Sequence, residues 1–177
     1  LHLLFAFIII SILFWTYLNY NYNENKIFFN YKNKLIKLLF ILIFFQIVIG
    51  AFVSGLDAGL IYQTWPKMNF SYFPDDLDIN NIFFLSIFNN QSFVQFLHRS
   101  IAYIIFAIVL FLGFKLYLVD KTKYIKSYFN VFFVLILQIS LGIFTLISGL
   151  NLFLASLHQI FSVILVFTVL NLNHKFS

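Results

Sequence analysis

The amino-acid sequence predicts an all-α integral membrane protein with five transmembrane helices, the last four of which form a four-helix bundle with pseudo-twofold symmetry. Of its 177 residues, 62% are hydrophobic and only 10% are charged, and the mean hydropathy is +0.95. A water-soluble domain of this size could not cover its core with so little polar surface. The apolar runs are long and do not alternate with polar residues, which excludes a transmembrane β-barrel.

Five apolar segments are long enough to cross a bilayer, which takes about 20 residues in a helix. They cover residues 3–20, 35–55, 92–118, 128–148 and 152–172. A further apolar stretch, residues 81–88, is too short to span, and we expect it to lie in the membrane interface. The chain starts inside an apolar run without a methionine, so we expect an N-terminal part to be missing.

The basic residues predict the orientation of these helices. One side of the predicted membrane carries nine of the eleven Lys and Arg residues: Lys26, Lys32, Lys34, Lys37, Lys115, Lys121, Lys123, Lys126 and Lys175. The other side carries only Lys67 and Arg99, together with most of the aspartates. By the positive-inside rule the lysine-rich side faces the cytoplasm or the mitochondrial matrix. The net charge of +5 is therefore explained by topology, and we expect no nucleic-acid partner.

An internal repeat relates two of the predicted helices. The segment FQIVIGAFVSGL, residues 45–56, resembles LQISLGIFTLISGL, residues 137–150. Each places a glutamine four residues before a glycine: Gln46 and Gly50, and Gln138 and Gly142. Small residues let membrane helices approach closely and would also make room for a flat macrocycle.

Each repeat is followed by a helix that carries a histidine near its outer end, His98 in the first and His158 in the second. Two neutral imidazoles that face each other across a bundle axis are the arrangement that a six-coordinate heme iron needs. The chain has no cysteine, so any bound iron would use histidine or another non-thiolate ligand. His2 lies at a similar outer depth, whereas His174, beside Lys175, is expected to be a solvated tail residue.

Simpler interpretations of these residues stay open at this point. A single intramembrane histidine often serves only as a hydrogen-bonding partner between helices. Arg99 could extend to the lipid headgroups or pair with a heme propionate. Gln46 and Gln138 could be interhelical hydrogen-bonding residues, and the sequence does not assign roles to them, to Asp57 or to Lys67.

Three segments resemble the heme A synthase family. GAFVSGLDAGLIYQTWPKMN, residues 50–69, resembles the end of its fifth helix and the following outer loop. QFLHRSIAY, residues 95–103, is similar to its sixth helix, and residues 137–165 are similar to its seventh and eighth. The resemblance covers essentially the whole chain, as helices four to eight of an eight-helix protein, and the absence of cysteine matches the proteobacterial and mitochondrial branch.

The resemblance implies a domain layout. Residues 1–20 are the last helix of an otherwise missing N-terminal four-helix half, and residues 21–34 are a cytoplasmic or matrix linker. Residues 35–172 are a C-terminal heme b-binding half with an outer loop at residues 56–91, and residues 173–177 are an inner tail. The protein would lie in the bacterial or mitochondrial inner membrane, with its heme site near the outer face.

The resemblance also implies a function and a set of site residues. The family oxidises the C8 methyl of heme O to the formyl of heme A, for cytochrome oxidase assembly, with water as the oxygen source. Heme b would be ligated by His98 and His158 and would relay electrons, with Arg99 as a propionate contact and His2 as a ligand of the substrate heme. Heme O synthase would be the heme donor, the electron acceptor is open, and a homo-oligomer is possible. We expect this fragment alone to be inactive.

Two other functions are compatible with the residues. One is a bis-histidine b-type cytochrome that transfers electrons from quinol, which would share the heme and differ in substrate. The other is a non-heme membrane transporter whose histidines form a polar relay. The near absence of charged residues inside the predicted helices disfavours the transporter, since ion and proton paths usually need them.

Overall fold

The computed structural model describes residues 2–28, 34–77, 88–118 and 122–177. It has five long helices, in chain order α1 His2–Tyr22, α2 Lys34–Gly55, α3 Gln91–Leu118, α4 Thr122–Ile147 and α5 Leu152–Phe176, with a short 3-10 helix η1, Ala58–Leu60, after α2. Each of the five is long and apolar enough to cross a membrane. The prediction of a five-span helical membrane protein is confirmed, and most of the predicted interfacial segment 81–88 lies outside the described residues.

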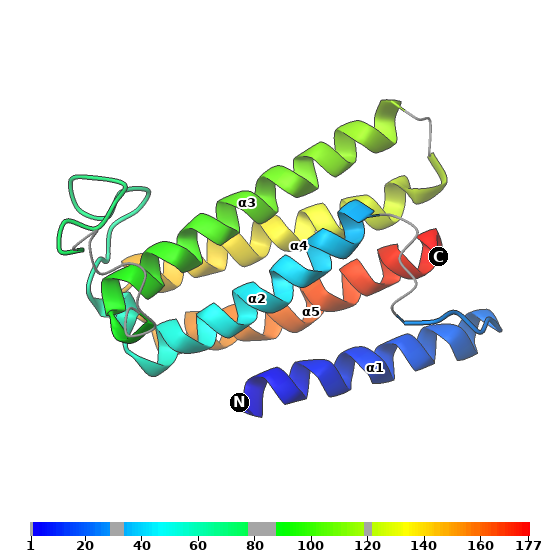
Figure 1. Ribbon diagram of the computed structural model, residues 1–177, viewed down its shortest axis with the longest axis horizontal. Helices are drawn as coiled ribbons and strands as arrows, with labels where there is room; N and C mark the ends of the chain where they lie inside the picture. The colour runs from blue at the N-terminus through cyan, green and yellow to red at the C-terminus, as the bar shows by residue number, and fades with distance from the viewer. Residues whose placement is uncertain (1, 29–33, 78–87, 119–121) are drawn as a thin grey trace.

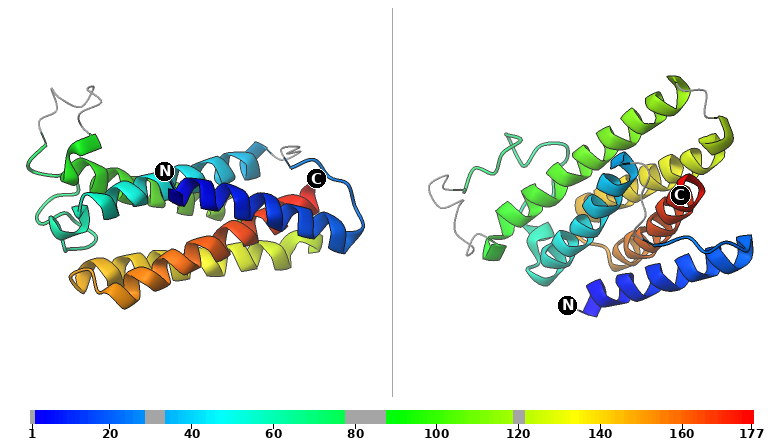
Figure 2. Two further views of the ribbon diagram at one scale, coloured as in Figure 1. Left: turned by 90° about the horizontal axis from the view of Figure 1, so that it is seen from below. Right: turned by 45° about the vertical axis from the view of Figure 1, so that its right-hand side comes forward.

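The four helices α2 to α5 run lengthwise through the molecule (Figure 1). The α2–α3 connection and the α4–α5 turn lie together at one end, called the loop end below, and the C-terminus lies at the other. Helix α2 pairs most extensively with α3, and α4 with α5. Figure 2 shows these two pairs on opposite sides of the bundle, while α1 lies outside it, against α5 and α2.

The apolar core fills the end of the bundle away from the loop end. Fully buried side chains come there from all four helices, including Leu39, Leu112, Val131 and Val166, each 0% exposed. At this end Gly113 lets the Tyr128 ring lie directly against the α3 backbone, because a Cβ at residue 113 would overlap the Tyr128 hydroxyl. Because side chains pack densely at this end, the two helix pairs separate toward the loop end.

The turn between α4 and α5 is tight and sets the start of α5. Gly149 and Leu150 both adopt left-handed backbone conformations, with φ of 71° and 63°, and the Leu150 amide donates to Thr145 O at 2.9 Å. Asn151 then caps α5, since its side-chain oxygen accepts from the amides of Phe153 and Leu154. Such C-terminal and N-terminal caps satisfy helix-end groups that have no partner within the helix.

His174 is not the solvated tail residue that the sequence predicted. Its side chain is 1% exposed, its Nε2 lies 2.9 Å from Asn19 Oδ1, and its ring meets the Trp15 ring edge-on. The Trp15 indole in turn donates to Lys26 O at 2.9 Å. The prediction was wrong because α5 extends to Phe176 and α1 packs along it, which the sequence of the tail does not reveal.

Candidate functional site

A cavity of about 370 Å³ lies near the loop end, between the α2–α3 pair and the α4–α5 pair. This volume is in the range of small-molecule and cofactor sites. Its lining is almost entirely apolar, with side chains such as Phe106, Ile136 and Ile139, and its polar side chains include His98, Arg99 and His158. Three residues that the sequence singled out therefore line one cavity.

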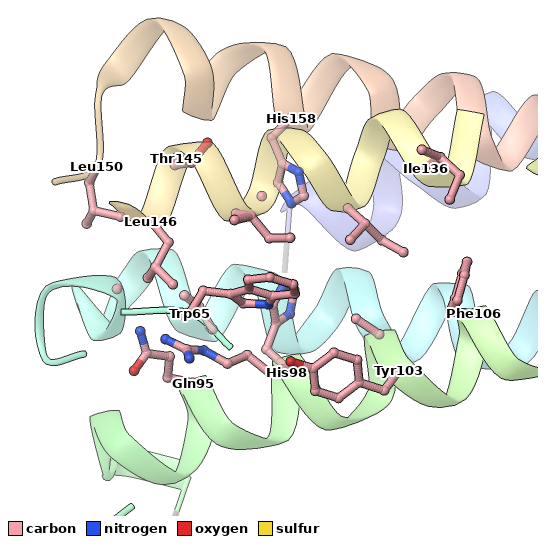
Figure 3. A pocket seen from close by; sticks show the side chains of 17 residues that line it. Trp65, Gln95, His98, Tyr103, Phe106, Ile136, Thr145, Leu146, Leu150 and His158 are labelled. Carbon is pink, nitrogen blue, oxygen red and sulfur yellow. The ribbon is translucent and has the colours of Figure 1, made fainter. Parts of the chain in front are cut away.

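The two histidines face this cavity from opposite sides. His98 is on α3 and His158 on α5, each about two helical turns from the loop end of its helix. Figure 3 shows the His158 ring extending toward His98 across the cavity that Trp65 and Tyr103 also line. This is the placement that the sequence predicted for the pair.

The repeat Gln138–Gly142 packs directly against His158. The His158 Nδ1 donates to the backbone oxygen of Gln138 at 3.0 Å, and the Gln138 side-chain nitrogen lies 3.4 Å from His158 Nε2. A Cβ at Gly142 would lie 2.9 Å from His158 Cε1, closer than real Cβ contacts. The glycine is therefore the cradle into which the imidazole fits.

The first repeat packs against His98 in a matching way. The Gln46 side-chain nitrogen lies 3.3 Å from His98 Nε2 and donates to His98 O at 2.9 Å. A Cβ at Gly50 would lie 3.1 Å from His98 Cε1. Each Gln–Gly repeat of the sequence thus holds one histidine of the helix that follows it.

The donor set and the space around it fit a heme. The two histidines line one apolar cavity from opposite sides, and imidazole is a donor that heme iron takes from proteins. Several buried polar atoms beside the pair have no partner among the described residues: Gln46 Oε1, Gln138 Oε1 and His98 Nδ1. Buried polar atoms are normally hydrogen-bonded, and exceptions point to function or to a missing group.

Arg99 fastens the segment that follows η1 over the cavity. Its guanidinium donates to the backbone oxygens of Tyr62 at 2.8 Å, Thr64 at 2.9 Å and Lys67 at 3.3 Å. Gln95 adds a bond to Tyr62 O at 2.9 Å. These contacts hold the segment that carries Trp65, which lines the cavity. Three of the five guanidinium N–H groups are used in this way, so the predicted propionate contact stays a prediction for the remaining two.

Asp76 is a loop residue to which sequence reasoning gave no role. It accepts hydrogen bonds from the Tyr62 hydroxyl at 2.7 Å and from Ser92 Oγ at 2.6 Å. Burial acts to raise the pKa of Asp76, but the hydrogen bonds from Ser92 and Tyr62 outweigh it, so its pKa lies below the usual 3.8. Burial, and then the bond to Asp76, raise the pKa of Tyr62. The ionised carboxylate therefore ties the loop to the start of α3.

The remaining candidates lie away from the histidine pair. His2 begins α1, is exposed and is not among the residues that line the cavity. Asp57 adopts a left-handed conformation before η1, and its side chain makes no capping hydrogen bond. The Lys67 ammonium lies 6.0 Å from the centre of the Tyr72 ring.

Five membrane-spanning helices, four of them around a cavity with paired histidines, define an integral membrane protein of the helical-bundle class. A model of the cytochrome oxidase assembly protein family COX15-CtaA matches residues 1–170. The chain belongs to this family, and its predicted kinship with heme A synthases is confirmed.

Several curated relatives carry the name heme A synthase. The chain is 43% identical to the one from Pelagibacter ubique over 170 residues, which is 94% of this chain and 48% of that protein. It is 36% identical to the one from Wolbachia pipientis wMel over 168 residues, or 93% of this chain and 46% of the relative. It is 33% identical to the Flavobacterium psychrophilum protein over 180 residues, or 100% of this chain and 53% of the relative. The chain spans about half the length of the curated relatives it matches, and no solved structure matches it.

Proposed function

We propose that this chain is the heme b-binding half of a heme A synthase. That enzyme is an oxidoreductase that converts the C8 methyl of heme O to a formyl group. With water as the oxygen source, the methyl group and one water yield the formyl group, four protons and four electrons. The observation that carries the proposal is that both Gln–Gly repeats hold a histidine at the same cavity. The names of the relatives support the same assignment.

The chain's own residues supply a binding site for the heme. Heme b, when bound, provides a redox centre for one-electron steps. His98 and His158 would each offer an imidazole nitrogen to the iron, and Gly50 and Gly142 leave the room that the rings need. The apolar lining excludes water, which lowers the local dielectric and tunes the potential of such a centre.

The same proposal assigns roles to Arg99 and His2. Arg99 holds Trp65 over the cavity and keeps two N–H groups for an anionic propionate. His2 is proposed as a ligand of the substrate heme, which would be bound largely by residues that this chain does not contain. The fragment alone would then bind heme b without completing the reaction.

We further propose an inner-membrane location with the heme site near the outer face. The support is the charge asymmetry among the described residues: the loop end carries Lys67 and Arg99, whereas the opposite helix ends carry Lys34, Lys37, Lys115, Lys126 and Lys175. Heme O synthase is the proposed heme donor, and four electrons per formyl group must leave to an acceptor that the chain does not identify. A homo-oligomer is compatible with the assignment.

The experiment that tests the function uses the full-length protein that contains this chain, produced with a heme O synthase in a host without heme A. Extracted hemes are separated by chromatography, and the purified protein is examined by absorption spectroscopy. We expect heme A in the extract, and loss of the heme b Soret band in His98→Ala and in His158→Ala. Ser156→Ala, on the exposed face of α5, is the matched control and should keep the band.

Two outcomes would favour the other functions. A normal Soret band with heme O but no heme A in the extract would favour a b-type cytochrome. A Soret band that survives both histidine substitutions, or is absent from the parent, would favour a non-heme protein. Against the transporter stands the composition of the five spanning helices, in which no Asp or Glu occurs.

A further inference from the structure

We propose that Gln46 is a positioning residue that sets the tautomer of His98, in the role that the backbone oxygen of Gln138 fills for His158. Both imidazoles would then carry their proton on Nδ1 and keep Nε2 unprotonated for a metal. The inference rests on the proposed heme site and deepens it by naming what sets the protonation of its two histidines before heme binds. Which ring nitrogen carries the proton is set by the bonds of the other nitrogen.

The tautomer of His158 follows from one contact. A backbone oxygen can only accept a hydrogen bond, and His158 Nδ1 lies 3.0 Å from Gln138 O. Nδ1 must therefore carry the proton, which leaves Nε2 as an acceptor in the neutral ring. The Gln138 side-chain nitrogen, 3.4 Å from Nε2, faces it as a donor.

His98 lacks the equivalent backbone contact. Its Nδ1 is buried and has no hydrogen-bond partner among the described residues, so nothing on that side of the ring selects a tautomer. Among the described residues, the side chain that contacts the ring nitrogens is that of Gln46, whose amide nitrogen lies 3.3 Å from Nε2.

The orientation of the Gln46 amide is fixed by a second bond. The same end of the amide lies 2.9 Å from the backbone oxygen of His98. Only the NH₂ group can donate there, because the reversed amide would place two acceptor oxygens against each other. The NH₂ group therefore also faces His98 Nε2.

Only one tautomer of His98 makes that contact a hydrogen bond. With the proton on Nε2, two N–H donors would meet, and the unpartnered Nδ1 would gain nothing in exchange. With the proton on Nδ1, Nε2 accepts from Gln46. The amide oxygen of Gln46 is buried without a partner among the described residues. The hydrogen bonds of its NH₂ group are therefore the ones that fix the position of the side chain. The two repeats thus reach one protonation pattern through different contacts.

The test is ¹⁵N NMR of the ring nitrogens in heme-free, histidine-labelled protein, which needs no bound heme. In the full-length protein the signals of His98 and His158 are assigned by replacing each histidine singly. In the parent we expect the Nδ1–H tautomer at both His98 and His158. A parent His98 that is protonated at Nε2 would overturn the proposal without any variant of Gln46.

A matched pair of substitutions sharpens the test. Gln46→Met removes the amide while it keeps the length of the side chain, and we expect the Nε2–H form of His98 to become the major species. Gln138→Met should leave His158 in the Nδ1–H form, because the backbone oxygen remains. Because the Gln46 NH₂ group occupies the Nε2 lone pair that a metal would need, the affinity of the Gln46 variant for heme b should equal or exceed that of the parent.

The outcomes separate this inference from the proposed function. An unchanged tautomer at His98 in Gln46→Met, or a shifted one at His158 in Gln138→Met, would overturn the inference, and the heme site could still stand. Loss of the Soret band in the histidine variants tests the site itself. Gln159→Leu, at an exposed position next to His158, controls for an unspecific effect of replacing a glutamine.

Discussion

Replacing Gly142 with alanine should weaken heme binding more than any other single-methyl change in the repeats. The added Cβ would lie 2.9 Å from His158 Cε1 and 3.4 Å from His158 Nδ1. Ordinary carbon–carbon contacts lie at about 3.5–4.0 Å, so the imidazole must retreat by roughly 0.6–1 Å. At Gly50 the corresponding distance to His98 Cε1 is 3.1 Å, so the His98 ring would have to move by less.

The magnitude follows from two opposing terms. Alanine in place of a helix-interior glycine gains about 0.8–1.0 kcal/mol, whereas overpacking costs about 1–3 kcal/mol. In the heme-free protein the His158 ring can turn away into the cavity. This loses its bond to Gln138 O, at a cost of about 0.5–1.5 kcal/mol that offsets the helix gain, so the stability of Gly142→Ala should stay close to that of the parent. Heme binding requires the ring to return, so the overpacking cost appears in the affinity, as a loss of about 5- to 150-fold.

The assay is a titration of purified, heme-free protein with heme b, followed at the Soret band, together with thermal unfolding of the same samples. Gly55→Ala is the control, because a Cβ there has nothing within 4 Å; it should bind heme like the parent. The expected order of affinity is Gly55→Ala, then Gly50→Ala, then Gly142→Ala. Parental affinity in Gly142→Ala would refute the idea that this glycine makes room for a heme-binding histidine.

Three further predictions concern the loop and α1. The pKa of Asp76 is lowered in the folded protein, so its ionised form stabilises the fold above the usual pKa of 3.8, and this stabilisation is lost as the pH falls through the lower folded value. Asp76→Asn should remove this acid dependence. It should also cost about 1 kcal/mol at pH 7, measured by thermal unfolding. Arg99→Lys replaces a planar guanidinium that donates to three backbone oxygens, so the attachment of the loop should weaken by roughly 1–3 kcal/mol. Acrylamide should then quench the fluorescence of Trp65 more strongly, with Trp65→Phe used to identify the Trp65 signal. Asn19→Ala removes bonds to Lys26 and His174 and should cost about 1–3 kcal/mol in thermal unfolding, whereas the exposed Asn21→Ala should be neutral.

Each of these has a result that contradicts it. An acid unfolding profile in Asp76→Asn that equals the parental one would mean that the carboxylate does not tie the loop. Equal quenching of Trp65 in the parent and in Arg99→Lys would mean that other contacts hold the segment. An equal loss of stability in Asn19→Ala and Asn21→Ala would show that the α1–α5 contact does not depend on the Asn19 side chain.

The helices and the histidine pair could be predicted because both depend on local or repeated patterns. Spanning helices follow from about 20 apolar residues in a row, and the structure places their ends within a few residues of the predicted ones, except at the start of α4 and the end of α5. The Gln–Gly repeat predicted that His98 and His158 occupy matching positions. Periodicity carries this information because the helix fixes which residues share a face.

The contacts of the loop and of α1 could not be predicted in the same way. The bonds of Arg99 join residues 32 to 37 positions apart, and His174 meets a residue 155 positions away. No local pattern encodes such distances, and an arginine beside a histidine in the sequence suggests a shared ligand as readily as a loop anchor. The role of Asp76 depends on Tyr62 and Ser92, which no motif links to it.

The two halves of the site hold their histidines in similar ways, but different kinds of segment close the cavity on each side at the loop end. The second repeat ends in a four-residue turn whose Leu150 packs against Gly59, where a Cβ would overlap it, so this side is closed by helix-end geometry. The first repeat ends in a long connection that is held to α3 by hydrogen bonds of Gln95 and Arg99. Hydrogen bonds of a loop open at lower free energy than packed helix ends. The cover on the His98 side, formed by the segment that carries Trp65, is therefore expected to open at lower free energy than the turn on the His158 side.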